Sequence, residues 1–206
     1  MAQTIDINVQ QTLQNVTIEA NPNEYVINVN QILAPAGTNG IFAQTSLGNS
    51  VVYANGEASL IGLGVGSLSV PANAFKIGDS FVAKMCGKIS CANNQQIHFR
   101  VRSNGVVIID ALAYTLATCT NKYFDLILDF TITKIGGAGV AELFANGIFS
   151  YNKDASNAME GVHFGLVSNT VFDTTVSNTL DITAEWTTSN IADTIQSQNF
   201  VLTKVY

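Results

Sequence analysis

Three side chains that can carry positive charge alternate along one predicted strand near the middle of the chain. His98, Arg100 and Arg102 are spaced two residues apart, and the residues between them are apolar. A period of two places all three on the same face of a β-strand. The chain has only nine Lys and Arg residues, and both of its arginines belong to this set. We therefore predict a contact ridge, formed by these three residues, for a carboxylate, a sugar similar to sialic acid or a neighbouring subunit.

A second interpretation of the contact ridge needs no ligand. Acidic side chains on adjacent strands, such as Asp125 and Asp129, would balance the charges of the arginines. These aspartates also raise the question of a catalytic carboxylate pair, but residues 123–133 alternate as a strand does. Residues four apart on a strand are separated by about 13 Å, whereas a retaining glycosidase needs about 5 Å between its carboxylates. A glycosidase pair within this strand is therefore excluded.

The cysteines Cys86, Cys91 and Cys119, together with His98, are residue types that bind metal ions. Their spacing matches no standard zinc pattern, so we expect no metal site. The odd number of cysteines and the polar N-terminus, which lacks a secretory signal, argue against a disulfide framework. We expect free thiols, in a protein made in a reducing cytoplasm. The sequence contains no nucleophile elbow, and we expect no catalytic residues, no cofactor and no enzymatic activity.

The composition restricts the classes of partner. The chain has 206 residues, of which 47% are hydrophobic and 12% are charged, about half the usual charged share. Asn, Thr, Ser and Gln must then supply much of the polar surface, which suits contacts with other proteins or with sugars. The formal net charge of −6 argues against nucleic acid or an anionic membrane as the main partner. No apolar run approaches the length of a membrane span.

Short alternating strands separated by turn signals would position these residues. Residues 67–89 show the pattern as a strand, a corner and a second strand, and it continues to Tyr206 without an amphipathic helix. Strands at this spacing predict an all-β fold, an antiparallel β-sandwich of the jelly-roll type, over residues 67–206. Trp186 alternates with apolar residues in the penultimate strand, and we expect it to anchor the core.

Two further segments precede this body. Residues 1–33 contain three short alternating runs, which we interpret as an N-terminal β arm for assembly and anchoring. A few short strands bury little surface alone, so the arm needs a partner. Residues 34–66 are rich in glycine and are interpreted as a connector with short strands. Gly62, Gly64 and Gly66 are followed by a strand and not by a helix, which indicates close backbone packing and not a dinucleotide site.

Parts of the body resemble a known family. They are residues 70–80, VPANAFKIGDS, and the ending at 178–206, which includes NTLDITAEW and IQSQNFVLTKVY. These stretches resemble the β-sandwich surface proteins of virions, which occur in bacteriophage fibres and in capsid proteins of large DNA viruses. Residues 4–29 also resemble the Val-, Asn- and Thr-rich leaders of such proteins. The resemblance implies a structural or attachment role in an oligomer, and it carries over no site residues.

We therefore expect a viral structural protein, a virion-surface capsid-vertex or fibre-head component that self-assembles and contacts the host. The expected partners are copies of the same chain, as a trimer in preference to a pentamer, other virion proteins bound through the N-terminal arm, and a host-surface glycan or protein. The expected location is the virion surface, after synthesis in the host cytoplasm. The alternative is a non-viral carbohydrate-binding β-sandwich module, although most secreted lectins carry a signal peptide.

Overall fold

The structure is a computed structural model, and it describes residues 39–168 and 171–206. The predicted β arm, residues 1–33, lies outside the described residues. Within them the strands are β1 (Asn39–Gln44), β2 (Val51–Val52), β3 (Ala58–Ser59), β4 (Gly64–Gly66), β5 (Ser69–Val70), β6 (Ser80–Cys91), β7 (Gln95–Ser103), β8 (Val106–Leu116), β9 (Cys119–Lys134), β10 (Glu142–Asn152), β11 (Met159–Ser168), β12 (Asn178–Trp186) and β13 (Thr194–Lys204). A short 3₁₀ helix, η1 (Ala155–Asn157), follows β10.

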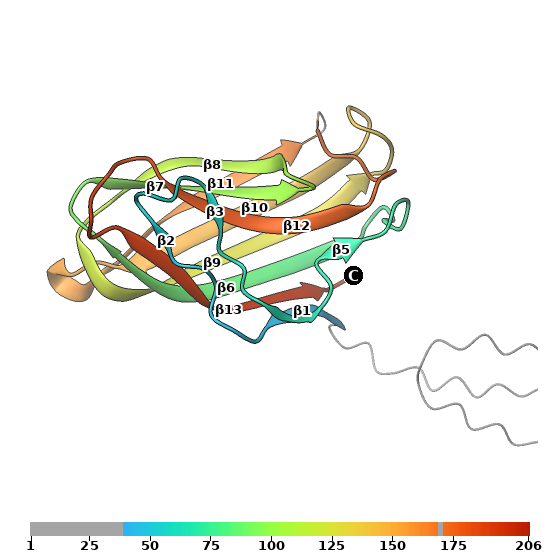
Figure 1. Cartoon of the computed structure of the whole chain (residues 1–206). Helices are drawn as coiled ribbons and strands as arrows, with labels where there is room; N and C mark the ends of the chain where they lie inside the picture. Colours follow the sequence, from blue (N-terminus) through green and yellow to red (C-terminus); the bar gives the residue numbers. More distant parts are fainter. Residues whose placement is uncertain (1–38, 169–170) are drawn as a thin grey trace, which may run out of the picture. The chain divides into compact units, whose positions relative to one another are not determined.

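The strands form two antiparallel sheets that face each other as layers (Figure 1). The eight-stranded sheet has the order β11-β10-β9-β6-β13-β1-β4, and β2 also pairs with β13. The five-stranded sheet has the order β3-β12-β7-β8, and β5 also pairs with β12. The predicted all-β sandwich is therefore confirmed, whereas its assignment to the jelly-roll type stays a prediction.

Alternating side chains build the core between the sheets. Along β9 the apolar residues at every second position are buried, and their neighbours point outward. Aromatic rings from the two sheets meet in the middle of the core, where the ring centroids of Phe99 on β7 and Phe149 on β10 are 4.7 Å apart. Phe149 also stacks on Tyr151, which lies on the same face of β10. Burial of this apolar surface is the main term that holds the sandwich together.

The structure corrects the boundary that was expected between connector and body. Residues 39–66 do contain short strands, but these strands are parts of the two sheets. β1 pairs with β13 and β4, β2 pairs with β13, and β3 pairs with β12. Val51 and Leu60 are fully buried in the common core. The body therefore begins no later than Asn39, and the segment before residue 67 is not a free connector.

The glycines of this segment permit a close approach of backbones, as their context predicted. A Cβ atom at Gly64 would overlap the carbonyl oxygen of Ala43, and one at Gly66 would overlap that of Ile41. Gly66 also has a φ of +96°, a backbone conformation that other residues rarely adopt. The glycines thus let β4 pair tightly with β1.

Trp186, the expected core anchor, lies at the end of β12 and is 5% exposed. Its indole Nε1 donates a hydrogen bond of 3.0 Å to the carbonyl oxygen of Val51 on β2. β2 pairs with β13 of the eight-stranded sheet, whereas β12 belongs to the five-stranded sheet. The tryptophan therefore connects the two layers through both its apolar ring and its polar group.

We predict that Trp186→Ala lowers the free energy of unfolding by about 3–5 kcal/mol, because it leaves a cavity in the core. Urea unfolding followed by circular dichroism measures the loss. Trp186→Phe is the matched control, because it keeps an aromatic ring in the core while it removes the Nε1 hydrogen bond and part of the ring volume. If Trp186→Ala lowers the free energy of unfolding no more than the control does, burial of the ring is not the main contribution of Trp186 to stability.

Candidate functional site

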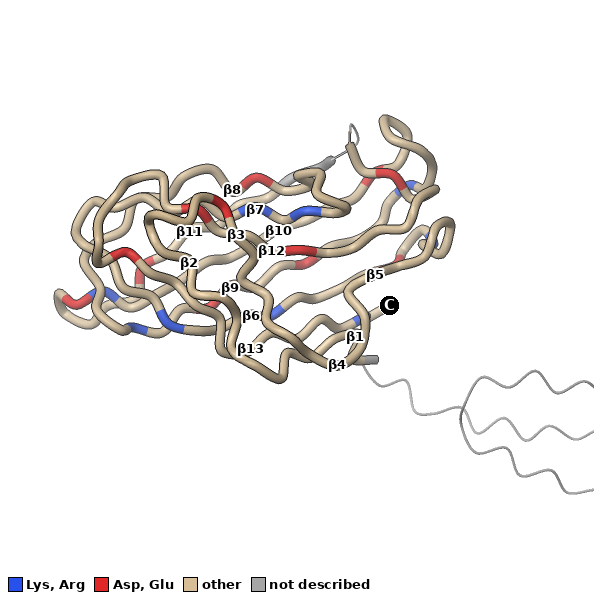
Figure 2. Tube along the Cα trace, in the orientation of Figure 1, with Lys and Arg blue, Asp and Glu red and all other residues tan. Residues whose placement is uncertain are grey.

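The densest group of charged side chains lies on the outward face of the five-stranded sheet. Charged positions are otherwise sparse along the chain (Figure 2). We define the polar cluster as Glu57, His98, Arg100, Arg102, Asp110, Asp181, Thr183 and Glu185. The inward residues of β7 are buried, so His98, Arg100 and Arg102 lie together on its outward face, as their spacing predicted. Across the register these three residues face Glu185, Thr183 and Asp181 of β12, respectively.

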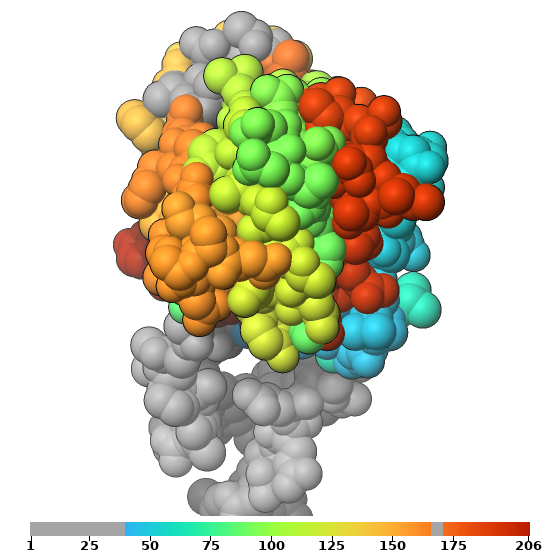
Figure 3. All heavy atoms as spheres, turned by 90° about the vertical axis from the view of Figure 1, so that its left-hand side faces the viewer, coloured from blue at the N-terminus to red at the C-terminus, as the bar shows by residue number. Residues whose placement is uncertain are grey.

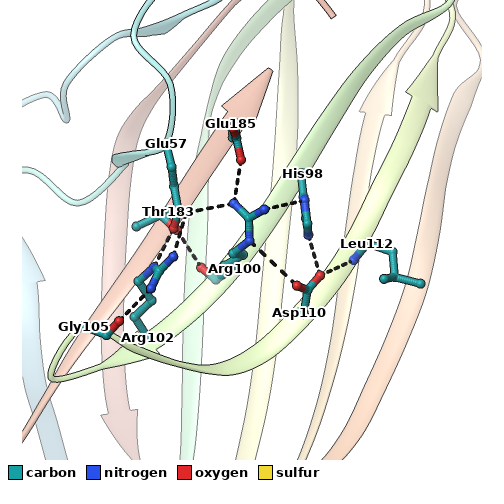
Figure 4. Close-up of polar contacts among 9 residues, drawn as sticks. All are labelled: Glu57, His98, Arg100, Arg102, Gly105, Asp110, Leu112, Thr183 and Glu185. Atoms are coloured by element: carbon teal, nitrogen blue, oxygen red, sulfur yellow. Dashed lines mark hydrogen bonds and ion pairs between the residues drawn. The ribbon is translucent and has the colours of Figure 1, made fainter. Parts of the chain in front are cut away.

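Arg100 is the centre of the cluster (Figure 4). Its Nη1 donates hydrogen bonds to Glu57 (2.8 Å) and Glu185 (2.7 Å), and its Nη2 donates one to His98 Nδ1 (2.9 Å). Its Nε is 3.7 Å from a carboxylate oxygen of Asp110. A register shift between β7 and β8 places Asp110 opposite Arg100. All three guanidinium nitrogens therefore already have partners within the chain.

The contacts of His98 determine its tautomer. An arginine can only donate, so the Nδ1 that faces Arg100 must be the acceptor and carries no proton. The ring proton is therefore on Nε2, which donates to Asp110 Oδ1. Neither ring nitrogen is left free to accept a proton from a bound molecule. In this arrangement His98 positions Asp110 and Arg100 and does not act as a general base.

Glu57, which lies between β2 and β3, ties the N-terminal part of the body to the cluster. Its carboxylate accepts hydrogen bonds from Nε (2.5 Å) and Nη2 (2.7 Å) of Arg102 and from the hydroxyl of Thr183 (2.5 Å). The hydrogen bond from Arg102 is the largest cause that lowers the pKa of Glu57 from 4.5 to about 2. Partial burial opposes this lowering, whereas the hydrogen bond from Thr183 and the charge of Arg100 add to it.

The remaining groups make the polar cluster acidic. Arg102 donates its last nitrogen, Nη1, to the carbonyl oxygen of Gly105 (2.6 Å). Asp181 accepts a hydrogen bond of 2.5 Å from the hydroxyl of Ser59. Partial burial raises the pKa of Asp110, but hydrogen bonds from His98 and the backbone N–H of Leu112 outweigh it, and the pKa is lowered. Two guanidinium groups thus lie among four carboxylates.

This geometry favours the interpretation of the contact ridge that needs no ligand. The arginines are paired inside the chain, and a carboxylate or sialic-acid-like ligand would meet an excess of negative charge. The partners differ from those expected, however. Asp125 and Asp129 lie on β9 of the other sheet, and Glu57, Asp110 and Glu185 make the ion pairs instead.

Sequence reasoning did not identify Glu57, the residue with the most contacts to the contact ridge. It is 43 residues before Arg100, in a glycine-rich segment without long alternating runs. One signal was available: it is an acidic residue in a chain with few charges. The partners on β12 and β8 would have required the strand order and register.

Among the described residues, no group of three or more His, Cys, Asp or Glu side chains is placed to hold a metal ion. Cys86 is half-buried and unpaired with another cysteine, whereas Cys91 and Cys119 are buried. The described part of the chain also contains no helix long and apolar enough to cross a membrane.

No model of a known protein family matches the chain. No curated protein matches it either.

We predict that the free energy of unfolding falls as the pH is lowered from about 4.5 towards 2, partly because of Glu57. In this range the unfolded chain binds a proton at Glu57 that the folded chain does not, so acid favours unfolding. Urea titrations at several pH values should give a shallower pH dependence for Glu57→Gln. Glu142→Gln is the matched control, because Glu142 makes only a 3.8 Å ion pair with Lys134 on the surface. Equal slopes for the two variants would contradict this role of Glu57.

Proposed function

We propose that the chain is a structural protein of the virion surface, a capsid-vertex or fibre-head component that assembles with copies of itself. The observation that carries this proposal is the outward side of the eight-stranded sheet, which we call the broad face. The polar cluster adds indirect support. Its two arginines already form ion pairs with carboxylates of the same chain. The cluster is therefore better suited to stabilise the fold than to bind an anionic ligand.

The broad face presents a row of seven aligned side chains, five of them apolar, that crosses seven strands and is called the apolar row. The residues of one row are aligned by the strand registers. In the order from β4 to β11 they are Val65, Ala43, Val201, Lys84, Ile127, Ile148 and His163. Val65 is 62% exposed and Phe144, in a neighbouring row on β10, is 59% exposed. An exposed surface that is largely apolar and carries a few charges is typical of contacts between proteins.

The charges of the broad face are balanced. Lys84 and Lys88 project from β6, and Asp125 and Asp129 project from the adjacent β9. Among the described residues none of these four makes an ion pair within the chain. A neutral face with both signs can oppose another protein surface without net repulsion, and it offers nucleic acid no basic patch. These properties support association with other copies, and we favour a trimer over a pentamer.

We predict that the full-length chain is a trimer at tens of micromolar and that Ile127→Glu dissociates it, because the variant places a charge in the apolar row. Multi-angle light scattering measures the mass. Ile191→Glu is the matched control, because Ile191 is 89% exposed in the segment between β12 and β13, away from the broad face. A monomeric parent chain would contradict self-assembly, and equal effects of both substitutions would contradict the assignment of the broad face.

The N-terminal arm is proposed to bind other virion proteins. The sequence of residues 1–33 alternates over runs too short to offset the entropy of ordering on their own, and such strands are stabilised by addition to a partner's sheet. We predict that deletion of residues 1–31 leaves a folded body and abolishes incorporation into the virion. Circular dichroism and an assembly assay test the two halves of this prediction. An unfolded truncated chain, or one that still assembles, would contradict it.

The alternative function, a carbohydrate-binding module, is favoured by one observation. Tyr123 on β9 is 64% exposed, and the ammonium group of Lys88 lies 4.8 Å from the centre of its ring. An exposed ring beside polar side chains is a surface on which a sugar can stack. Binding of immobilised glycans by a monomeric chain, with loss of binding in Tyr123→Ala, would support this alternative over the virion protein.

A further inference from the structure

Two of the three cysteines face each other across a pair of strands. Cys91 is the last residue of β6, Cys119 is the first residue of β9, and the two are direct partners in the register. Their sulfur atoms are 3.4 Å apart, and the residues are 2% and 1% exposed. Cys86 takes no part in this contact, because it lies opposite Asp125 in the same strand pair. The chain therefore holds one pair of thiols in direct contact and one separate thiol.

The backbone needs no rearrangement for these thiols to be joined. Opposite residues of antiparallel strands have Cα atoms about 4.5–5.5 Å apart, which falls within the range found in disulfides. Rotation of the two side chains is enough to bring the sulfur atoms to bonding distance. We propose that Cys91 and Cys119 form a cross-strand disulfide when the folded protein meets a peroxide.

The surroundings of the two sulfur atoms assign their roles. Cys91 Sγ lies 3.3 Å from the carbonyl oxygen of Ala117, and Cys119 Sγ lies 3.9 Å from that of Ile89. The thiol of Cys119 can donate a hydrogen bond to the sulfur of Cys91. This bond lowers the pKa of Cys91 and, with burial, raises that of Cys119. Cys91 is therefore the sulfur that reacts first, because the thiolate is the nucleophile.

The reaction is balanced with hydrogen peroxide as the oxidant. The Cys91 thiolate attacks one peroxide oxygen, the O–O bond breaks, and hydroxide leaves and takes up the proton lost from Cys91 to become water. The sulfur of Cys119 then attacks the sulfenic acid on Cys91. The S–S bond forms, the S–O bond breaks, and the second water leaves with the proton of Cys119. Two thiols lose two hydrogen atoms in total, and one peroxide is reduced to two waters.

The position of the cysteine pair at the ends of two strands allows a small oxidant to reach the sulfur atoms. The pair joins the end of β6 to the start of β9, and the connections next to these strand ends lie at the end of the sandwich that faces the viewer in Figure 3. There the segments around the β6–β7 and β8–β9 connections, η1 and the β12–β13 connection lie side by side. Asn93 and Asn94, just after Cys91, are exposed. Strand ends open locally more often than strand centres, so peroxide can reach these buried sulfur atoms without global unfolding.

The disulfide would close a loop between residues 28 positions apart. This loop contains β7 and β8 of the five-stranded sheet, whereas its two ends lie in the eight-stranded sheet. A cross-link of this kind stabilises chiefly by restricting the unfolded chain. Its timing rests on the proposed function, because a virion protein folds in a reducing cytoplasm and later meets an oxidising exterior.

The experiment treats the purified full-length chain with hydrogen peroxide and maps its peptides without reduction. We expect a peptide that joins Cys91 to Cys119, with the mass of two hydrogen atoms lost. Cys86→Ser should form the same cross-link, whereas Cys119→Ala should not. We also expect the melting temperature to rise by roughly 5–15 °C in the parent chain, and dithiothreitol to reverse the rise.

Peptide mapping of the parent chain shows whether the Cys91–Cys119 disulfide forms, even if a cysteine variant does not fold. Sulfinic or sulfonic acid at Cys91 without a cross-link would overturn the proposal, and so would cross-links made only by Cys86 between chains. The result is independent of assembly. A monomeric chain that forms the cross-link would support the disulfide and contradict the proposed self-assembly. A trimer that does not form the cross-link would support self-assembly and contradict the disulfide.

Discussion

The carboxylate of Glu57, held between two arginines, fixes the part of the chain on which the closure of the sandwich depends. Glu57 lies between β2, which pairs with the eight-stranded sheet, and β3, which pairs with the five-stranded sheet. Its bonds to Arg100 and Arg102 anchor this crossing to β7. Ion pairs at a fully exposed surface contribute little, but here the carboxylate is half-buried and accepts from three side chains. The same short segment supplies Val51, which is fully buried and accepts the hydrogen bond of Trp186.

The long strands could be predicted from the sequence because each repeats its pattern many times. β9 alternates over residues 123–133 and β7 over residues 96–103, so the side of the sheet on which each of these residues lies follows from counting. The outward position of His98, Arg100 and Arg102 follows in the same way. The close approach of the backbones near Gly64 and Gly66 could be predicted because a strand, and not a helix, follows them.

The partners of these residues could not be predicted, for reasons that lie in the geometry of pairing. β2 and β3 have two residues each, which is too few to show a period. Asp110 reaches Arg100 through a register shift, which a regular pattern does not reveal. Asp125 and Asp129 have the right charge and spacing, yet they lie on the wrong sheet, because alternation defines the face of a strand and not its neighbours. The same holds for the order of the strands, and with it for the jelly-roll type, because alternation within a strand does not define which strands are neighbours.

The place of β13 has a consequence for how the protein is made. This strand, Thr194–Lys204, follows all the others in the chain, yet it lies inside the eight-stranded sheet between β6 and β1. Until residue 204 has left the ribosome, β6 and β1 each expose an edge with unpaired backbone groups. Contacts between such distant parts of a chain form slowly, and the open edges are prone to pair with other nascent chains. During synthesis the chain therefore passes through a stage in which most residues of the sandwich have been added. At this stage the eight-stranded sheet is still in two separate parts, because β13 does not yet join them.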